Sequence, residues 1–148
     1  MANCMKYKLG FYLKEGVSEE IVNAMNALIN DSGLRSNLSN AKFFKKEWDN
    51  LFVKYNGYPD LIKIFNFCDV NKRYYLEVNI ENREERIDLL KSFLEWIVPY
   101  IDESSLADSR IGYLKKESVY DGSSIILSEG EISFVLDDCG YNGFGFII

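Results

Sequence analysis

Apolar and polar positions follow two different periods along the first third of the chain, and each period predicts its own kind of element. Between Lys6 and Lys14, apolar residues alternate with other residues, which predicts a first strand with Tyr7, Leu9, Phe11 and Leu13 on one side. From Ser18 the spacing becomes helical, with Ser18 as the N-cap and Gly33 as the stop. The buried stripe of this helix would be Ile21, Val22, Met25, Leu28 and Ile29.

The middle of the chain predicts a shorter helix followed by two strands. Apolar residues recur at helical spacing between Ala41 and Phe52, as Phe44, Trp48, Leu51 and Phe52. Two alternating runs follow, Leu61 to Phe67 and Arg73 to Ile80, separated by a polar turn at residues 69–72. In the second run Tyr74, Leu76, Val78 and Ile80 share one face.

The strongest helical pattern begins at Asn82, because Asn82 and Glu85 stand at the spacing of a capping box. Its apolar positions up to Val98 cover an arc of roughly 200°, about twice what one sheet contact needs. We therefore expect one stripe to pack on a sheet and the other on the helix that contains Phe44 and Phe52. The alternative is a contact with another subunit or a partner protein.

A strand over Arg110 to Lys116 and a hairpin complete the predicted elements. The hairpin strands run from Ser124 to Leu127 and from Glu131 to Leu136, across residues 128–130. This order predicts an α+β fold with the ferredoxin-like split βαβ order and an appended C-terminal β-hairpin. Both long helices would lie on one face of an antiparallel sheet, and residues 1–148 would form a single domain.

Composition and charge mainly exclude classes of partner and cellular location. The net charge is −6, and basic residues form only short clusters, so nucleic acid is not an expected partner. A protein partner with a basic surface fits this charge, although a negative charge also simply favours solubility. Three cysteines without metal-type spacing, no apolar run long enough for a membrane and no signal peptide predict a cytoplasmic protein with reduced thiols.

The chain contains no histidine, which removes the usual nucleophile pairs and most zinc sites. Phosphate-binding glycine motifs are also absent. Carboxylates are the remaining catalytic or metal-binding candidates, namely Glu129, Glu131, Asp137 and Asp138 around the predicted hairpin. We favour a solvated hairpin tip and strand exit for these four residues, and therefore expect neither a metal nor a cofactor.

An aromatic set offers a second kind of candidate site. If the two later helices pack together, one pocket could be lined by Trp48, Trp96, Tyr100 and Tyr113, with Glu117 as its polar group. Apolar walls with a few polar groups are typical of ligand sites. They are equally typical of the edge of a core, which is the interpretation we favour.

Three aromatic motifs add a resemblance to a known family. They are Phe43-Phe44 followed by Trp48, the run Phe93 to Ile97 with Pro99-Tyr100, and Ile111-Gly112-Tyr113 with Glu117. Over about residues 7 to 130 the chain resembles an uncharacterised family of small bacterial cytosolic proteins. Members often carry a His-Pro pair before the double Phe, where this chain has Ala41-Lys42, so no role of that histidine transfers. The resemblance implies a cytosolic single domain and no established activity.

Three functional hypotheses follow from the sequence. The first is a non-enzymatic protein-binding domain, such as an adaptor, an inhibitor or an immunity-type protein. The second is a small-molecule-binding regulatory domain that uses the aromatic pocket, and the third is a carboxylate or metal-dependent enzyme without histidine. A homodimer is also expected, because an open sheet leaves edges that pairing can cover.

Overall fold

The computed structural model describes residues 3–29, 45–52, 62–118 and 121–137. Within these residues the helices and strands follow one another as β1 (Cys4–Tyr12), α1 (Glu19–Ile29), the 3-10 helix η2 (Lys46–Leu51), β2 (Ile62–Cys68), β3 (Arg73–Arg83), η3 (Glu84–Arg86), α2 (Ile87–Ile97), η4 (Val98–Tyr100), η5 (Glu103–Ser105), β4 (Arg110–Lys116), β5 (Gly122–Ser128) and β6 (Glu131–Asp137). No described helix is long and apolar enough to cross a membrane.

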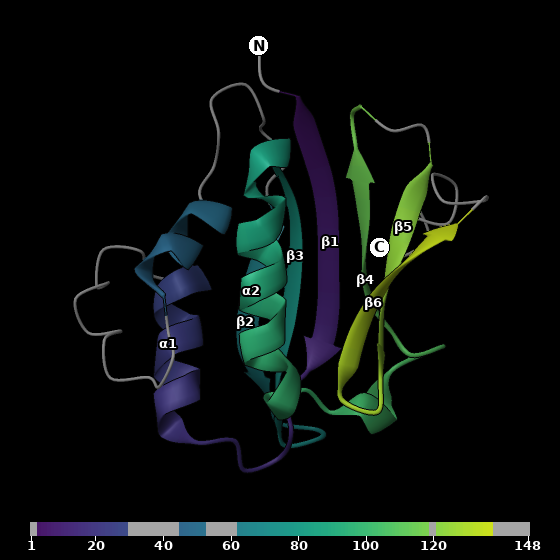
Figure 1. Cartoon of the computed structure of the whole chain (residues 1–148). Coiled ribbons are helices and arrows are strands. Elements are labelled where there is room, and N and C mark those ends of the chain that lie inside the picture. Colours follow the sequence, from purple (N-terminus) through teal and green to yellow (C-terminus); the bar gives the residue numbers. More distant parts are fainter. Residues whose placement is uncertain (1–2, 30–44, 53–61, 119–120, 138–148) are drawn as a thin grey trace.

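The strands form one six-stranded sheet in the order β2-β3-β1-β4-β5-β6, and all neighbours are antiparallel. Figure 1 shows α1 and α2 on the same face of this sheet, in front of the half that contains β2, β3 and β1. The predicted α+β class, with helices packed on an antiparallel sheet, is therefore confirmed. No described helix lies in front of β4, β5 and β6 in this view (Figure 1).

The predicted alternation in β1 and β3 places the core on the helix side of the sheet. Met5, Tyr7, Leu9 and Phe11 are each at most 2% exposed, and they pair with Asn82, Ile80, Val78 and Leu76 of β3. The predicted stripe of α1 is buried against the same core. Burial of these side chains is the main stabilising term, because burial of each large apolar side chain contributes roughly 1.5–3 kcal/mol.

The broad apolar arc of α2 is divided as the sequence predicts. Leu90 and Phe93 are buried in the core cluster that also contains the sheet residues, while Trp96 lies against Trp48 of η2. Leu89 is partly buried. Phe44 lies outside the described residues, but Trp48 and Phe52 provide the expected second contact. The segment that supplies them is a 3-10 helix rather than the expected α-helix over 41–52, of which residues 41–44 are not described.

The predicted N-cap at Asn82 is wrong. Asn82 lies inside β3, and α2 begins only at Ile87 after the turn of η3. Its fully buried side chain donates through Nδ2 to the carbonyl oxygen of Asn50 (2.9 Å) and, more weakly, to that of Leu51 (3.4 Å). Because these bonds satisfy the amide inside the core, the strand continues past the residue that the capping pattern marked.

The β5–β6 hairpin turns through Glu129 and Gly130, which both have positive φ values, 53° and 80°. A two-residue turn of this kind matches the twist of the strands that flank it. The carboxylate of Glu103 in η5 accepts hydrogen bonds from the backbone N–H groups of both turn residues, at 3.0 Å each. The tip of the hairpin is thus attached to the connection between α2 and β4.

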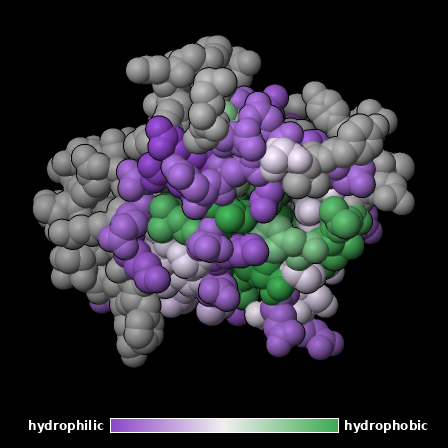
Figure 2. Space-filling model, turned by 45° about the horizontal axis from the view of Figure 1, so that its top comes forward, coloured by the Kyte–Doolittle hydropathy of each residue, from purple (hydrophilic) through white to green (hydrophobic). Residues whose placement is uncertain are grey.

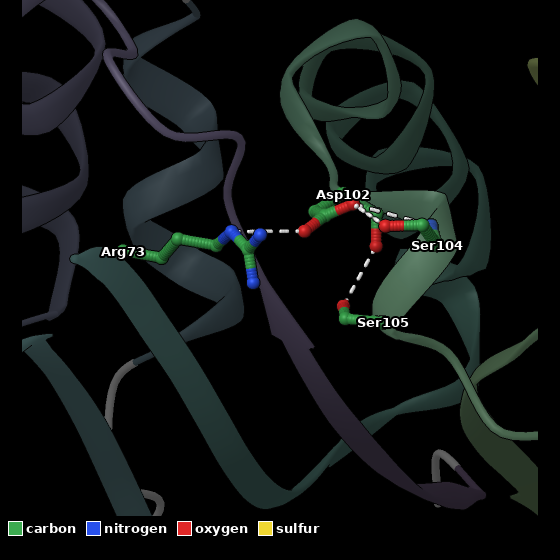
Figure 3. Close-up of polar contacts among 4 residues, drawn as sticks. All are labelled: Arg73, Asp102, Ser104 and Ser105. Atoms are coloured by element: carbon green, nitrogen blue, oxygen red, sulfur yellow. Dashed lines mark hydrogen bonds and ion pairs between the residues drawn. The ribbon is translucent and has the colours of Figure 1, made fainter. Parts of the chain in front are cut away.

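The same connection is attached to β3 through Asp102 (Figure 3). One carboxylate oxygen of Asp102 lies 3.0 Å from Nε of Arg73 at the start of β3. The other accepts hydrogen bonds from the backbone N–H and the hydroxyl of Ser104, and the Asp102 carbonyl accepts one from the Ser105 hydroxyl. Asp102 is therefore both the cap of η5 and the partner of an ion pair.

Asp102→Ala is expected to lower the free energy of unfolding by about 1–2 kcal/mol, as the sum of a lost cap and a lost partly exposed ion pair. Asp102→Asn keeps an oxygen that can cap η5 and should lose less. Urea denaturation of the two variants measures the difference. Equal losses would contradict the capping role of Asp102.

Candidate functional site

The predicted aromatic pocket is only partly assembled. Trp48 and Trp96 lie with their ring centroids 5.1 Å apart, and Tyr100 lies 6.2 Å from Trp96. Nε1 of Trp48 donates a hydrogen bond to Oγ of Ser92 at 2.8 Å, and Trp48 is 1% exposed. The two tryptophan rings pack on each other and on Phe93, and Tyr100 packs on Trp96, so the cluster fills the junction between η2 and α2.

The other two predicted pocket residues do not join this cluster. Tyr113 of β4 pairs with Lys8 of β1, so its side chain is on the face of the sheet opposite the helices, where it is fully buried. Glu117 follows the end of β4, is exposed, and accepts a hydrogen bond from the backbone N–H of Cys4 at 3.2 Å. The sheet therefore separates Tyr113 from the two tryptophans, which the aromatic pattern alone could not reveal.

The predicted carboxylate candidates are also separated. Glu131 pairs with Ser128 beside the hairpin turn, whereas Asp137 pairs with Gly122 at the far end of β6. Strand geometry puts about 20 Å between these two backbone positions. Asp138 lies outside the described residues. Within the residues that are described, no group of three or more possible ligand side chains could hold a metal ion.

Two buried polar side chains, Tyr7 and Asn82, hold η2 against the sheet. The sequence pattern did not predict this role for either residue. The hydroxyl of Tyr7 in β1 donates to the carbonyl of Leu51, the same carbonyl that Asn82 approaches. Burial raises the pKa of the Tyr7 hydroxyl well above its usual range, although the bond with Asn82 and the charge of Arg86 oppose this effect. The hydroxyl therefore stays protonated and acts as a structural donor. The sequence signal for this bond was a Tyr on the apolar side of an alternating strand, because a buried Tyr hydroxyl needs a hydrogen-bond partner.

The helix-free face of the sheet carries a polar row across β1 and β3. Burial lowers the pKa of Lys8, and the nearby Glu77 partly offsets this change. Burial and then the charge of Glu77 raise the pKa of Tyr75 to about 12, and Tyr75 Oη donates to Glu77 at 3.1 Å. A cavity of about 30 Å³ lies among these residues. Such a volume accommodates about one water molecule and is far below the size of a ligand pocket.

A larger hollow lies on the helix side, between α2 and β6. It has a volume of about 250 Å³ and is lined by Lys91, Glu95, Ile132, Ser133 and Phe134. Nζ of Lys91 lies 5.2 Å from the centroid of the Phe134 ring, within the range of a cation–π contact. The groove therefore has a charged wall on α2 and an apolar wall on β6.

The outermost strand carries further apolar side chains on both of its faces. Val135 is 49% exposed and Leu136 is 66% exposed, while Ile132 and Phe134 are partly buried. Figure 2 shows apolar residues gathered on the side of the molecule where Figure 1 places the β5–β6 hairpin. We call Ile132, Phe134, Val135 and Leu136 the β6 edge surface. Sequence reasoning placed this strand but overlooked that residues 132–136 contain neither a charge nor a proline.

Comparison with known proteins returns no relative: no family model, no curated protein and no solved structure matches the chain. Interpretation of the β6 edge surface therefore depends on its own chemistry.

Proposed function

We propose that this chain is a non-enzymatic protein-binding domain, and that its contact surface is the β6 edge surface with the adjoining groove. The observation that carries the proposal is the exposure of Val135 and Leu136 on an outermost strand. A strand in this position presents unpaired backbone groups that can bind a strand of another chain. The neighbouring groove adds apolar surface with a charged rim, which is the usual composition of a contact site.

We also propose that β1, α1, β2, β3, α2 and β4 form a ferredoxin-like unit to which the β5–β6 hairpin is appended. The strand order β2-β3-β1-β4 supports this proposal. In such a unit both helices cover one face of four strands, so added strands extend the sheet beyond the helices. This arrangement explains why β6 lies beyond the two helices (Figure 1), with Lys91 and Glu95 of α2 on the other side of the groove.

A photoreactive residue at position 136, in cells that produce the protein, tests the proposed function. Illumination should give a discrete covalent adduct with a protein that mass spectrometry identifies. The matched control places the same photoreactive residue at position 70. Val70 is 94% exposed and lies in the turn after β2, at the opposite edge of the sheet from β6. Position 70 should give no such adduct.

The adduct supports the proposal only if the identified protein, once purified, also binds this chain and binds the Leu136→Lys variant more weakly. No adduct from position 136, or the same adducts from both positions, would contradict the proposed function.

A further inference from the structure

We propose that the β6 edge surface binds a second copy of this chain, with β6 pairing antiparallel to β6 of the other copy about a two-fold axis at Phe134. This inference rests on the proposed function and names the partner. Three observations carry it: the direction of the backbone groups of β6, the self-complementary pattern of its side chains, and the contrast with the opposite edge of the sheet.

The backbone groups of β6 follow from the register of the hairpin. Ser128 and Glu131 flank the two-residue turn. In such a hairpin this pair exchanges both hydrogen bonds, and the pairs alternate from there along the strands. Ser133 and Val135 therefore direct their N–H and C=O groups toward β5. The remaining positions, Ile132, Phe134 and Leu136, direct theirs toward the outer edge, where no described strand pairs with them.

The side chains of those same positions complement themselves. In an antiparallel pair centred on Phe134, Phe134 faces Phe134 of the second copy, and Ile132 faces Leu136 of the second copy. All these side chains lie on the helix side of the sheet, because Phe134 pairs with the buried Ile125 and Ile132 pairs with the buried Leu127. A two-fold interface uses one surface twice, so an edge must match its own reverse, and this one does.

The opposite edge of the sheet carries a protecting device that β6 lacks. Lys63 of β2 pairs with the buried Val78, so its side chain is on the helix side of the edge strand. A charged residue that points inward on an edge strand disfavours pairing with a further strand, because its charge would be buried. Residues 132–136 of β6 contain no charged residue. The two edges therefore differ in kind, and β6 is the one suited to self-association.

Charge gives the proposed dimer a distinctive salt response. Each copy has a net charge of −6, and positions 131 and 137, both acidic in sequence, come opposite each other at the ends of the paired segment. Sodium chloride screens repulsion between exposed like charges. The dissociation constant should therefore fall as the salt concentration rises. A complex between this acidic chain and a basic protein would show the opposite dependence.

Sedimentation of the purified full-length chain tests the association. Because a short edge forms a small interface, the concentration series should extend from about 1 µM to about 1 mM. We expect a monomer–dimer equilibrium. Leu136→Lys should weaken it at least about tenfold, since a two-fold axis makes each substitution act twice. Val70→Lys, an equally apolar and more exposed position beyond β2, should leave it unchanged.

Phe134→Pro is a second disrupting variant, because proline removes an N–H group that points to the outer edge rather than to β5. Its circular dichroism spectrum shows whether the fold is retained. If both disrupting variants are folded and associate as tightly as the parent chain, the proposal is overturned.

Disulfide trapping tests the register. In the proposed pair, Ser133 faces Val135 of the second copy with a Cα separation of about 4.5 Å, which a disulfide can span. The test uses chains whose native cysteines are replaced by serine. A mixture of the Ser133→Cys and Val135→Cys chains should therefore form a mixed disulfide when copper phenanthroline and oxygen oxidise the two thiols. Neither chain should cross-link with itself. Rapid self-linking of Ser133→Cys would overturn the register centred on Phe134.

The two proposals fail in different ways. A chain that stays monomeric over the whole concentration series and forms no mixed disulfide overturns the dimer. If position 136 nevertheless links to a different, identified protein in cells, the proposed function stands without the dimer. If position 136 links to nothing, both are overturned.

Discussion

Gly112→Ala is expected to lower the free energy of unfolding by about 3 kcal/mol or more. A Cβ atom at position 112 would lie 2.1 Å from the backbone carbonyl oxygen of Lys8 on the neighbouring strand β1. It would also lie 2.9 Å from Cδ2 of Leu9. A carbonyl in a central strand cannot rotate away as a side chain can, so β1 and β4 would have to separate.

Gly10→Ala is the matched control for this substitution. The new Cβ would meet only Oη of Tyr75, at 3.5 Å, which is an ordinary van der Waals contact. Its effect should stay within about 1 kcal/mol, because the cost of a small contact is offset by the reduced freedom of the unfolded chain. Urea denaturation of both variants measures the comparison. A Gly112→Ala chain as stable as Gly10→Ala would show that β1 and β4 approach each other less closely than described.

Trp48→Ala should lower the free energy of unfolding by about 3–5 kcal/mol, the range for removal of a large buried aromatic side chain. Trp48 is 1% exposed and contacts the rings of Phe93 and Trp96 at centroid distances of 5.7 and 5.1 Å. The substitution also removes the hydrogen bond to Ser92. Because the Trp48 ring packs against Trp96, its loss should expose Trp96 and shift the remaining tryptophan fluorescence to longer wavelength.

Phe67→Ala serves as the control for Trp48→Ala, because Phe67 is also a large aromatic residue but is 46% exposed. Thermal denaturation should show a much smaller loss for it, about 1 kcal/mol or less. The comparison also separates two interpretations of the tryptophan cluster. A wall of an open ligand pocket would tolerate Trp48→Ala with a small change in stability, whereas a core residue would not.

Sequence periodicity was sufficient for the elements whose burial follows a simple repeat. The strand over Arg110–Lys116 has the predicted bounds, and the stripe of α1 and the alternation in β3 are buried as expected. The helix makes its own backbone hydrogen bonds, and in α1 and β3 one face carries the buried apolar residues. Their prediction therefore requires no knowledge of what lies opposite.

Prediction failed where a residue's role depended on a distant partner. Asn82 has the correct spacing for a cap, but its amide is satisfied by backbone carbonyls at residues 50 and 51, which no local pattern reveals. Tyr113 was grouped with Trp48 and Trp96 by chemistry, although its strand register turns it to the other face. Likewise, the hairpin was predicted, but its position at the end of the sheet, and hence the open edge of β6, depended on the strand order.

The hydrogen bonds from the hairpin tip to the Glu103 carboxylate make the orientation of β6 depend on a segment that is distant from it in sequence. A hairpin held only by the pairing of β5 with β4 can bend about that pairing, and its outer strand β6 then changes its angle to the rest of the sheet. Because the tip is also bonded to Glu103 in the connection that follows α2, the hairpin is held at two places, along β4 and at its tip. A substitution of Glu103 would therefore change the orientation of β6 without changing any residue of β6.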